Sequence, residues 1–124
     1  MAKLRLRPRI SETPEASADQ LYAKFMGGLA DPIRLRIVRL LADGPRSVGE
    51  IVEHLALSQS RVSNHLACLK WCGYVDARRE GRSIIYRLTD RRIRKILELA
   101  QAVVADNAAH IAACARLAEP GGRL

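Results

Sequence analysis

The chain has 124 residues, enough for one compact core and too few for two separate domains. It carries 21 Lys and Arg against 13 Asp and Glu, a net charge of +8, and only one Trp, one Phe and three Tyr. The scarcity of aromatic residues argues against an aromatic-rich β-sandwich and favours a mostly helical fold with an aliphatic core. The positive charge predicts nucleic acid as partner, and the lack of a long apolar run or signal segment predicts a cytoplasmic protein with no membrane partner.

The two ends of the chain differ from its middle. Residues 1–16 contain two prolines and four basic residues without apolar periodicity, which predicts a flexible basic arm, either without a role or following DNA phosphates. Residues 17–118 carry the periodic apolar pattern and predict one folded domain, and residues 119–124 predict a short tail.

Three helices are predicted in the first half of the domain. Apolar residues recur at helical spacing over 16–29. Asp31 followed by Pro32 predicts the start of a second helix, since Asp can cap free amides and Pro loses no hydrogen bond at the first position. Gly44 and Pro45 end that helix, and Ser47 predicts the cap of a short third one.

The second half predicts a winged helix-turn-helix. Ser58 can cap a fourth helix, about 58–71, whose buried stripe is Val62, Leu66 and Leu69. After Gly73 the apolar period changes to two, and the segments 74–79 and 83–88 predict a two-stranded hairpin. A long Ala-rich helix then runs from Asp90 towards Arg116, and its exposed apolar face predicts a homodimer formed through the terminal helices.

The fourth helix is the predicted recognition helix, because the second helix of a helix-turn-helix presents its N-terminal half to the major groove. Its polar residues can bind base edges and phosphates, although a polar helix face is often only solvated. Three arginines on the hairpin can reach the DNA backbone or minor groove, or serve only to protect a strand edge. The predicted DNA-binding residues are Gln59, Ser60, Arg61, Ser63, Asn64, His65, Arg78, Arg79 and Arg82.

Three segments together resemble the ArsR/SmtB family of metal-responsive repressors: ADPIRLRI at 30–37, LSQSRVSNHLACL at 57–69 and GRSIIYRL at 81–88. The resemblance covers residues 20–117 and implies a homodimeric winged-helix repressor that leaves a palindromic operator when an inducer binds. Residues 68–72 are similar to the thiol pair of the family's mycobacterial cadmium and lead sensors, and Cys114 resembles their third ligand, which the other subunit supplies. The Cys-x-Cys pair of other members is absent at 47–50, as are the zinc sensors' ligands in the last helix.

Cys68 and Cys72 are four residues apart on a helix, so both sulfurs can bind one ion. We expect Arg61, His65, Cys68 and Cys72 to form one stripe opposite the core, continuing the DNA-facing side. With Cys114 as implied by the family, three thiolates would select Cd, Pb, Hg or trivalent As as the inducer, with no organic cofactor. His110 is interpreted either as a fourth ligand or as a surface histidine.

Two other function classes are weaker. The cysteines could instead form a disulfide in a redox-sensing repressor, or simply pack as small apolar residues. The sequence lacks a nucleophile with its base, a phosphate-binding loop and clustered carboxylates, so no enzyme is predicted.

Overall fold

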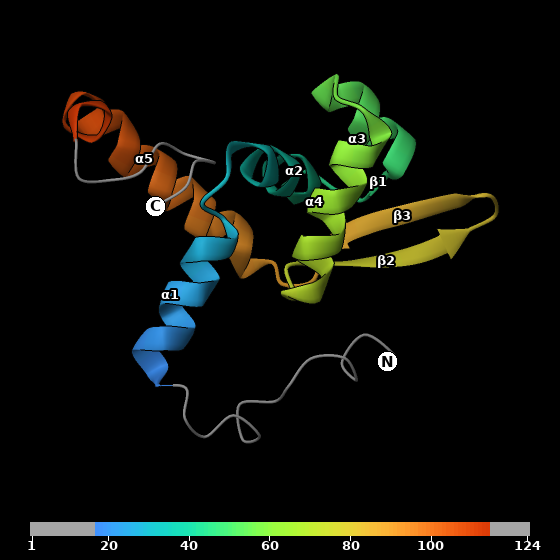
Figure 1. Ribbon diagram of the computed structural model, residues 1–124, viewed down its shortest axis with the longest axis horizontal. Helices are drawn as coiled ribbons and strands as arrows, with labels where there is room; N and C mark the ends of the chain where they lie inside the picture. The colour runs from blue at the N-terminus through green and yellow to red at the C-terminus, as the bar shows by residue number, and fades with distance from the viewer. Residues whose placement is uncertain (1–16, 115–124) are drawn as a thin grey trace.

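The computed structural model describes residues 17–114, and this part of the chain forms five helices and three strands (Figure 1). The predicted basic arm and the residues from 115 to the end lie outside the described residues. The elements in chain order are α1 (Ala18–Gly28), α2 (Pro32–Ala42), β1 (Arg46–Ser47), α3 (Val48–Leu55), α4 (Gln59–Trp71), β2 (Val75–Glu80), β3 (Ser83–Leu88) and α5 (Arg92–Ala113). The predicted mostly helical winged helix-turn-helix is confirmed.

Side-chain caps fix where the central helices begin. Asp31, Ser47 and Ser58 each have extended backbone and accept a hydrogen bond from the backbone N–H three residues later, at 3.0 to 3.2 Å. Such a cap satisfies one of the four amides that a helix start leaves unpaired. The starts of α2, α3 and α4 predicted from these residues are therefore confirmed.

The core is aliphatic and lies where α2, α3 and α4 pack together and against the sheet and the start of α5. Val62, Leu66 and Leu69, the predicted stripe of α4, are fully buried. Tyr74 is the one aromatic residue of the buried core cluster. The fully buried side chains of greatest volume are Ile37, Val38, Ile51, Val62, Leu66, Leu69 and Val75.

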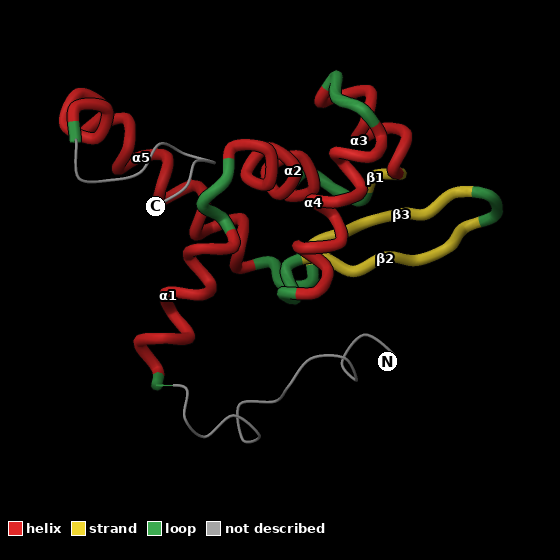
Figure 2. The backbone as a smooth tube through the Cα atoms, in the orientation of Figure 1, coloured by secondary structure: helices red, strands yellow, loops and turns green. Residues whose placement is uncertain are grey.

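The sheet has three antiparallel strands in the order β1-β3-β2, whereas the sequence predicted only the β2–β3 hairpin (Figure 2). The added strand β1 is two residues long, with Arg46 opposite Tyr86 and Ser47 opposite Ile85. Two residues are too few to show the alternation that marks a strand. The hairpin turn is also tighter than predicted, because Glu80 already pairs with Ser83.

Helix α5 leaves the domain after its first turns (Figure 1). Only Ile93 and Leu97 of this helix are buried, whereas Leu99, Val103, Val104 and Ile111 are exposed. Helical geometry is interrupted at Asn107, whose side-chain amide donates to the Val103 carbonyl at 2.9 Å. The helix ends at Ala113, so the predicted extension to Arg116 lies outside the described residues. No helix within 17–114 is long and apolar enough to cross a bilayer.

Candidate functional site

The turn between α3 and α4 sets the position of the recognition helix. α3 ends at Leu55, and the following residue, Ala56, adopts the left-handed conformation with φ of 56°. Leu57 then packs against the core, and Ser58 caps α4. The N-terminal half of α4 is consequently held at the surface by a short, fixed connection.

Five of the predicted DNA-binding residues on α4 are exposed: Gln59, Ser60, Arg61, Ser63 and Asn64. Apart from a 3.3 Å contact between the hydroxyls of Ser60 and Ser58, none of the five makes a side-chain hydrogen bond within the described part of the chain. These donors and acceptors are therefore available to a partner.

His65 differs from these five residues. Its side chain is only 22% exposed, and its Nδ1 lies 3.8 Å from the Asp31 carboxylate at the start of α2. Asp31 also caps α2 through the Arg34 N–H. His65 thus faces the α1–α2 connection rather than the outer surface of α4.

The stripe of Arg61, His65, Cys68 and Cys72, here called the thiol flank, does not lie opposite the core as expected. At 3.6 residues per turn these positions fall about 90° from the buried stripe of α4. The positions opposite the core are Ser60, Asn64, Ala67 and Trp71, here called the outer face, and all four are exposed. The thiol flank instead borders α1, because Cys72 lines a cavity with Phe25.

The wing, defined as the β2–β3 hairpin, projects from the domain (Figure 1). Arg78 is engaged within it, since its Nη2 lies 2.7 Å from the Glu80 carboxylate. Arg79 and Arg82 are exposed and form no ion pair within 17–114. Among the three predicted wing arginines, these two are the ones available to a phosphate.

Cys68 and Cys72 are both exposed thiols at the end of α4. The Cys72 N–H donates to the Cys68 carbonyl at 3.0 Å, so helical pairing reaches the end of this segment. Partial burial raises the pKa of the Cys72 thiol, and the neighbouring Cys68 raises it further. The two thiols therefore influence each other electrostatically.

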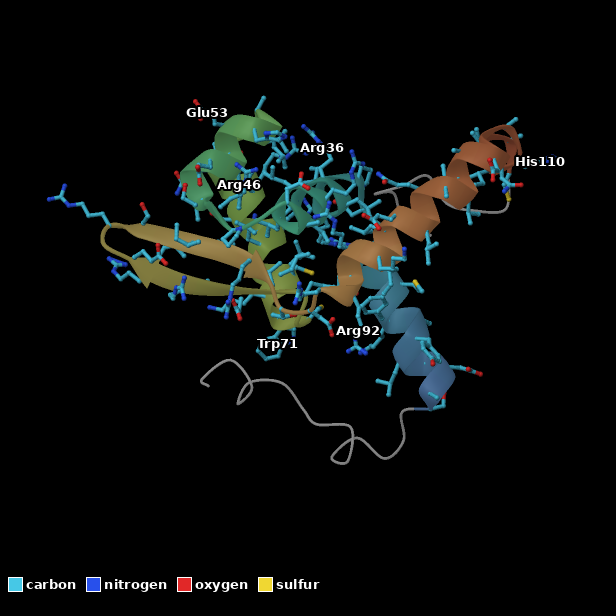
Figure 3. The ribbon with its side chains drawn as sticks, turned by 180° about the vertical axis from the view of Figure 1, so that it is seen from behind. Arg36, Arg46, Glu53, Trp71, Arg92 and His110 are labelled. Carbon is cyan, nitrogen blue, oxygen red and sulfur yellow. The ribbon has the colours of Figure 1, made fainter. Side chains whose placement is uncertain are left out.

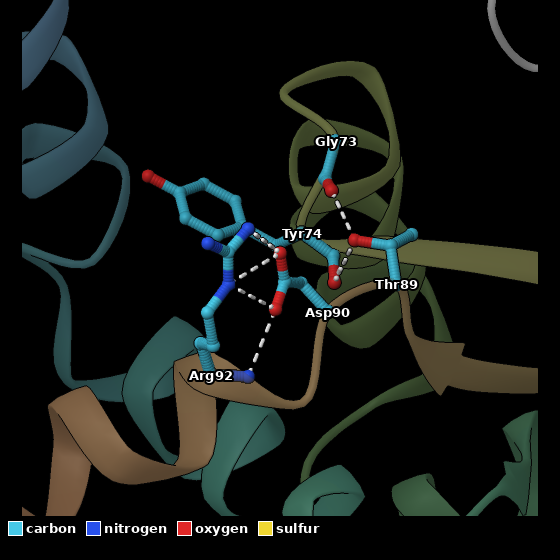
Figure 4. Close-up of polar contacts among 5 residues, drawn as sticks. All are labelled: Gly73, Tyr74, Thr89, Asp90 and Arg92. Carbon is cyan, nitrogen blue, oxygen red and sulfur yellow. Dashed lines mark hydrogen bonds and ion pairs between the residues drawn. The ribbon is translucent and has the colours of Figure 1, made fainter.

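A cavity of about 360 Å³ lies beside Cys72, between α1, the end of α4 and the start of α5. On its rim the Asp90 carboxylate accepts hydrogen bonds from the backbone N–H and guanidinium of Arg92 at 2.7 to 3.2 Å (Figure 4). These bonds lower the pKa of Asp90 to about 2. Thr89 ties the same loop to the end of α4 by donating to the carbonyls of Gly73 and Tyr74 (Figure 4).

Tyr74 connects the end of α4 to α1. Its hydroxyl donates to the Phe25 carbonyl, and the centroids of the Tyr74 and Phe25 rings lie 5.2 Å apart. Phe25 is in the last turn of α1, where backbone carbonyls lack helical partners. Arg34 satisfies another of these carbonyls by donating from Nε to Gly28 at 2.7 Å. Neither role could be predicted from the sequence, because Tyr74 has only the pattern of a strand residue and Arg34 that of a surface residue.

Cys114 lies at the opposite end of α5 from the thiol pair. Ile96 lines the cavity beside Cys72, and the 18 residues from Ile96 to Cys114 correspond to roughly 25 Å of helix. Figure 3 likewise shows His110 far from Trp71 and Arg92. Within 17–114 no three His, Cys, Asp or Glu side chains lie close enough to hold a metal ion. One subunit therefore does not bring the three cysteines together.

Comparisons with known proteins identify the family. Residues 31–77 match the family described as "Bacterial regulatory protein, arsR family". The chain is 44% identical over 99 residues to a probable mercury resistance operon repressor of Streptomyces lividans, covering 80% of this chain and 79% of that protein. It is 46% identical over 88 residues to the transcriptional regulator CmtR of Mycobacterium tuberculosis, covering 70% and 75%.

Solved structures agree with this result. The NMR structure of CmtR, described as a cadmium metal-sensor, has a TM-score of 0.57 at 46% identity, covering 65% of this chain and 85% of that one. A homodimeric winged helix-turn-helix DNA-binding domain from Mycobacterium bovis has a TM-score of 0.63 at 36% identity, covering 71% and 81%. These proteins are regulators rather than enzymes. The chain belongs to the ArsR family of bacterial regulatory proteins.

Proposed function

We propose that this chain is a transcriptional repressor that binds operator DNA as a homodimer and is released when a thiophilic heavy-metal ion binds its cysteine thiolates. The observation that carries the proposal is the exposed thiol pair, Cys68 and Cys72, on the last turn of the recognition helix. Relatives described as a mercury operon repressor and a cadmium sensor support a metal of this class.

The exposed apolar residues on α1 and α5 support a dimer formed by these helices. Tyr22 and Met26 on α1 are 70% and 56% exposed, and Val103 on α5 is 59% exposed. A monomer in water would leave these side chains hydrated, whereas a second copy of the chain would bury them. The homodimeric state of the M. bovis domain agrees with this arrangement.

In the proposed dimer the exposed residues in the N-terminal half of α4 and the wing contact DNA. Asn64 and Gln59 can pair bidentately with adenine and Arg61 with guanine. Ser60 and Ser63 carry hydroxyls suited to phosphates or base edges. Arg79 and Arg82 on the wing have no ion pair within the described residues and would bind the backbone.

The donor set fits a soft ion. Cys68 and Cys72 supply two thiols four residues apart on one helix, and their Cβ atoms are about 5 to 6 Å apart in this geometry. Asp90, the nearest carboxylate on the cavity rim, is committed to Arg92. In the proposed dimer a third thiolate would come from Cys114 of the partner subunit, because Cys114 lies at the far end of α5 within one subunit. When bound, a soft ion would hold these thiolates together and favour them over oxygen ligands.

The location of the thiol pair supports a release mechanism. The two recognition helices of a dimer must match half-sites about 34 Å apart on DNA. Drawing the end of α4 towards the C-terminus of the partner's α5 would change the tilt and spacing of these helices. The free energy of DNA binding would then depend on whether the thiols are engaged.

The test is a titration of the reduced protein with Cd²⁺, Pb²⁺, Hg²⁺ and Zn²⁺ without oxygen, followed by binding to the operator. Cys68→Ser, Cys72→Ser and Cys114→Ser should each bind DNA normally and lose the metal response. Ala30→Ser is the control, because it adds a hydroxyl at an exposed position outside α4 and the wing without removing a thiol. Sulfur-to-metal absorption bands count the ligands, and unchanged binding by Cys114→Ser would exclude Cys114.

The redox alternative is less well supported. A disulfide needs Cβ atoms about 3.5 to 4.5 Å apart, closer than an intact helical pair allows, and α4 is helical to its end. Loss of DNA binding with peroxide but with none of the four metals would establish the redox mechanism instead.

A further inference from the structure

We propose that the cavity between α2, β1 and α3 is an oxyanion site that binds a phosphate group. This cavity has a volume of about 260 Å³ and is separate from the cavity beside Cys72. Its lining consists of Arg36, Arg39, Leu40, Asp43, Arg46 and His54. Three guanidinium groups and an imidazole thus meet around one hollow of the surface.

The single carboxylate of the lining does not neutralise these arginines. Asp43 lies 3.8 Å from the guanidinium of Arg94, a residue of α5 outside the cavity. Arg94 is held there because its Nη1 donates to the Ala42 carbonyl at 2.9 Å. No ion pair joins Asp43 or another acidic group within 17–114 to Arg36, Arg39 or Arg46. The cavity therefore keeps an excess of positive charge.

Arg46 provides a second, independent indication of a ligand. Its Nε is buried and is the one buried side-chain nitrogen or oxygen in the described part of the chain without a hydrogen-bond partner. A buried donor without a partner is unfavourable, and such groups usually bind a water or an ion. The backbone of Arg46 is fixed by pairing with Tyr86 of β3, which keeps this side chain at the cavity.

Several guanidinium groups around one cavity suit a phosphate, which offers several oxygens to separate donors. Guanidinium groups bind phosphate through paired N–H donors, and here they come from two elements, α2 and β1. Arg36 is partly oriented by donating from Nη2 to the Leu55 carbonyl at 3.4 Å. Figure 3 shows Arg36 and Arg46 on the same side of the molecule, beside α3. The phosphate could come from a DNA backbone or from free inorganic phosphate.

Thermal unfolding of the full chain in phosphate and in chloride, at equal ionic strength, tests the site. Phosphate should raise the midpoint of the wild type, as expected for a ligand that binds the folded state. Arg46→Gln and Arg39→Gln should each weaken phosphate binding at least tenfold. Lys95→Gln is the matched control, because it removes one charge from an exposed residue of α5 outside the cavity.

Arg39 is exposed, so Arg39→Gln preserves the test if Arg46→Gln folds poorly. Binding to a DNA duplex at several salt concentrations then identifies the source. If Arg39→Gln and Arg46→Gln each reduce the salt slope by about one and DNA abolishes the phosphate effect, the site holds a backbone phosphate. If the slope is unchanged and phosphate still binds the DNA complex, the ligand is free phosphate. An equal phosphate response in all three variants and the wild type would refute the site.

Discussion

Tyr74→Phe tests how α1 is attached to the rest of the domain. The substitution removes only the hydroxyl that donates to the Phe25 carbonyl and keeps the ring, which is 3% exposed and packs against Phe25. No residue of α1 itself is buried, so few apolar contacts hold this helix. The hydrogen bond from Tyr74 should therefore contribute a measurable part of the docking free energy of α1.

The expected magnitude follows from the unpaired carbonyl that remains. A buried acceptor without its donor costs about 1 to 3 kcal/mol, and the Phe25 carbonyl is only partly buried, so we expect a loss of about 1 to 2 kcal/mol. A change of that size corresponds to a factor of about 5 to 30 in an equilibrium constant. Amides of α1 should exchange faster by this factor, while those of α4 should follow global unfolding.

Denaturant unfolding measures the loss of stability, and native-state hydrogen exchange measures the faster exchange of the α1 amides. Both are done at equal protein concentration, because the stability of a dimer depends on concentration. Tyr22→Phe is the matched control, since Tyr22 is in the same helix, is 70% exposed and makes no side-chain hydrogen bond within the described residues. If Tyr74→Phe and Tyr22→Phe gave the same stability and the same exchange in α1, the hydroxyl would not hold this helix.

Three further predictions concern the same region. Burial raises the pKa of Tyr74 to about 12, above its ordinary value near 10. The protonated hydroxyl should therefore stabilise the fold fully below pH 10, and this stabilisation should be lost between pH 10 and 12. Unfolding of wild type and Tyr74→Phe as a function of pH measures the loss. A thiol binds a metal ion only after losing its proton, and burial raises the pKa of Cys72 above its ordinary value. The logarithm of Cd²⁺ affinity near neutral pH should therefore rise by about one more unit per pH unit in wild type than in Cys72→Ser, measured by chelator competition. Gly28→Ala should lower the free energy of unfolding by about 1 to 3 kcal/mol, measured with denaturant, because the new Cβ would lie 2.6 Å from Cε2 of Tyr74. The control is Gly27→Ala, whose Cβ meets nothing within 4 Å and which should be neutral or stabilising.

The elements of the fold could be predicted because their ends carry strong local signals. Asp31 with Pro32, Ser47 and Ser58 mark helix starts through chemistry that acts within three residues. Strand β1 could not be predicted, since Arg46 and Ser47 become a strand only by pairing with β3, about 40 residues later. The position of Asn107 likewise shows no signal strong enough to predict the break in α5.

The candidate site was predicted in its residue types but less well in its geometry. Helical periodicity grouped Cys68 and Cys72 correctly on one side of α4, yet it placed this side opposite the core. In the structure His65 lies near the Asp31 carboxylate, and Cys72 lines a cavity together with Phe25. Contacts between α4, α2 and α1 are long-range, and periodicity within one helix contains no information about which neighbours border its flanks.

The separation of the two sides of α4 has a consequence for how release would work under the proposed function. The N-terminal half of α4 would contact DNA, whereas Cys68 and Cys72 lie at its C-terminal end beside α1, which carries exposed apolar residues of the proposed dimer interface. An ion at Cys68 and Cys72 would therefore not need to compete with DNA for the same surface. Tyr74, two residues beyond Cys72, already joins the end of α4 to α1 through the Phe25 carbonyl. Metal binding by the thiols would thus change the spacing of the two recognition helices through this contact. Tyr74→Phe should therefore bind Cd²⁺ as tightly as the wild type in the absence of DNA, but Cd²⁺ should reduce its operator affinity less.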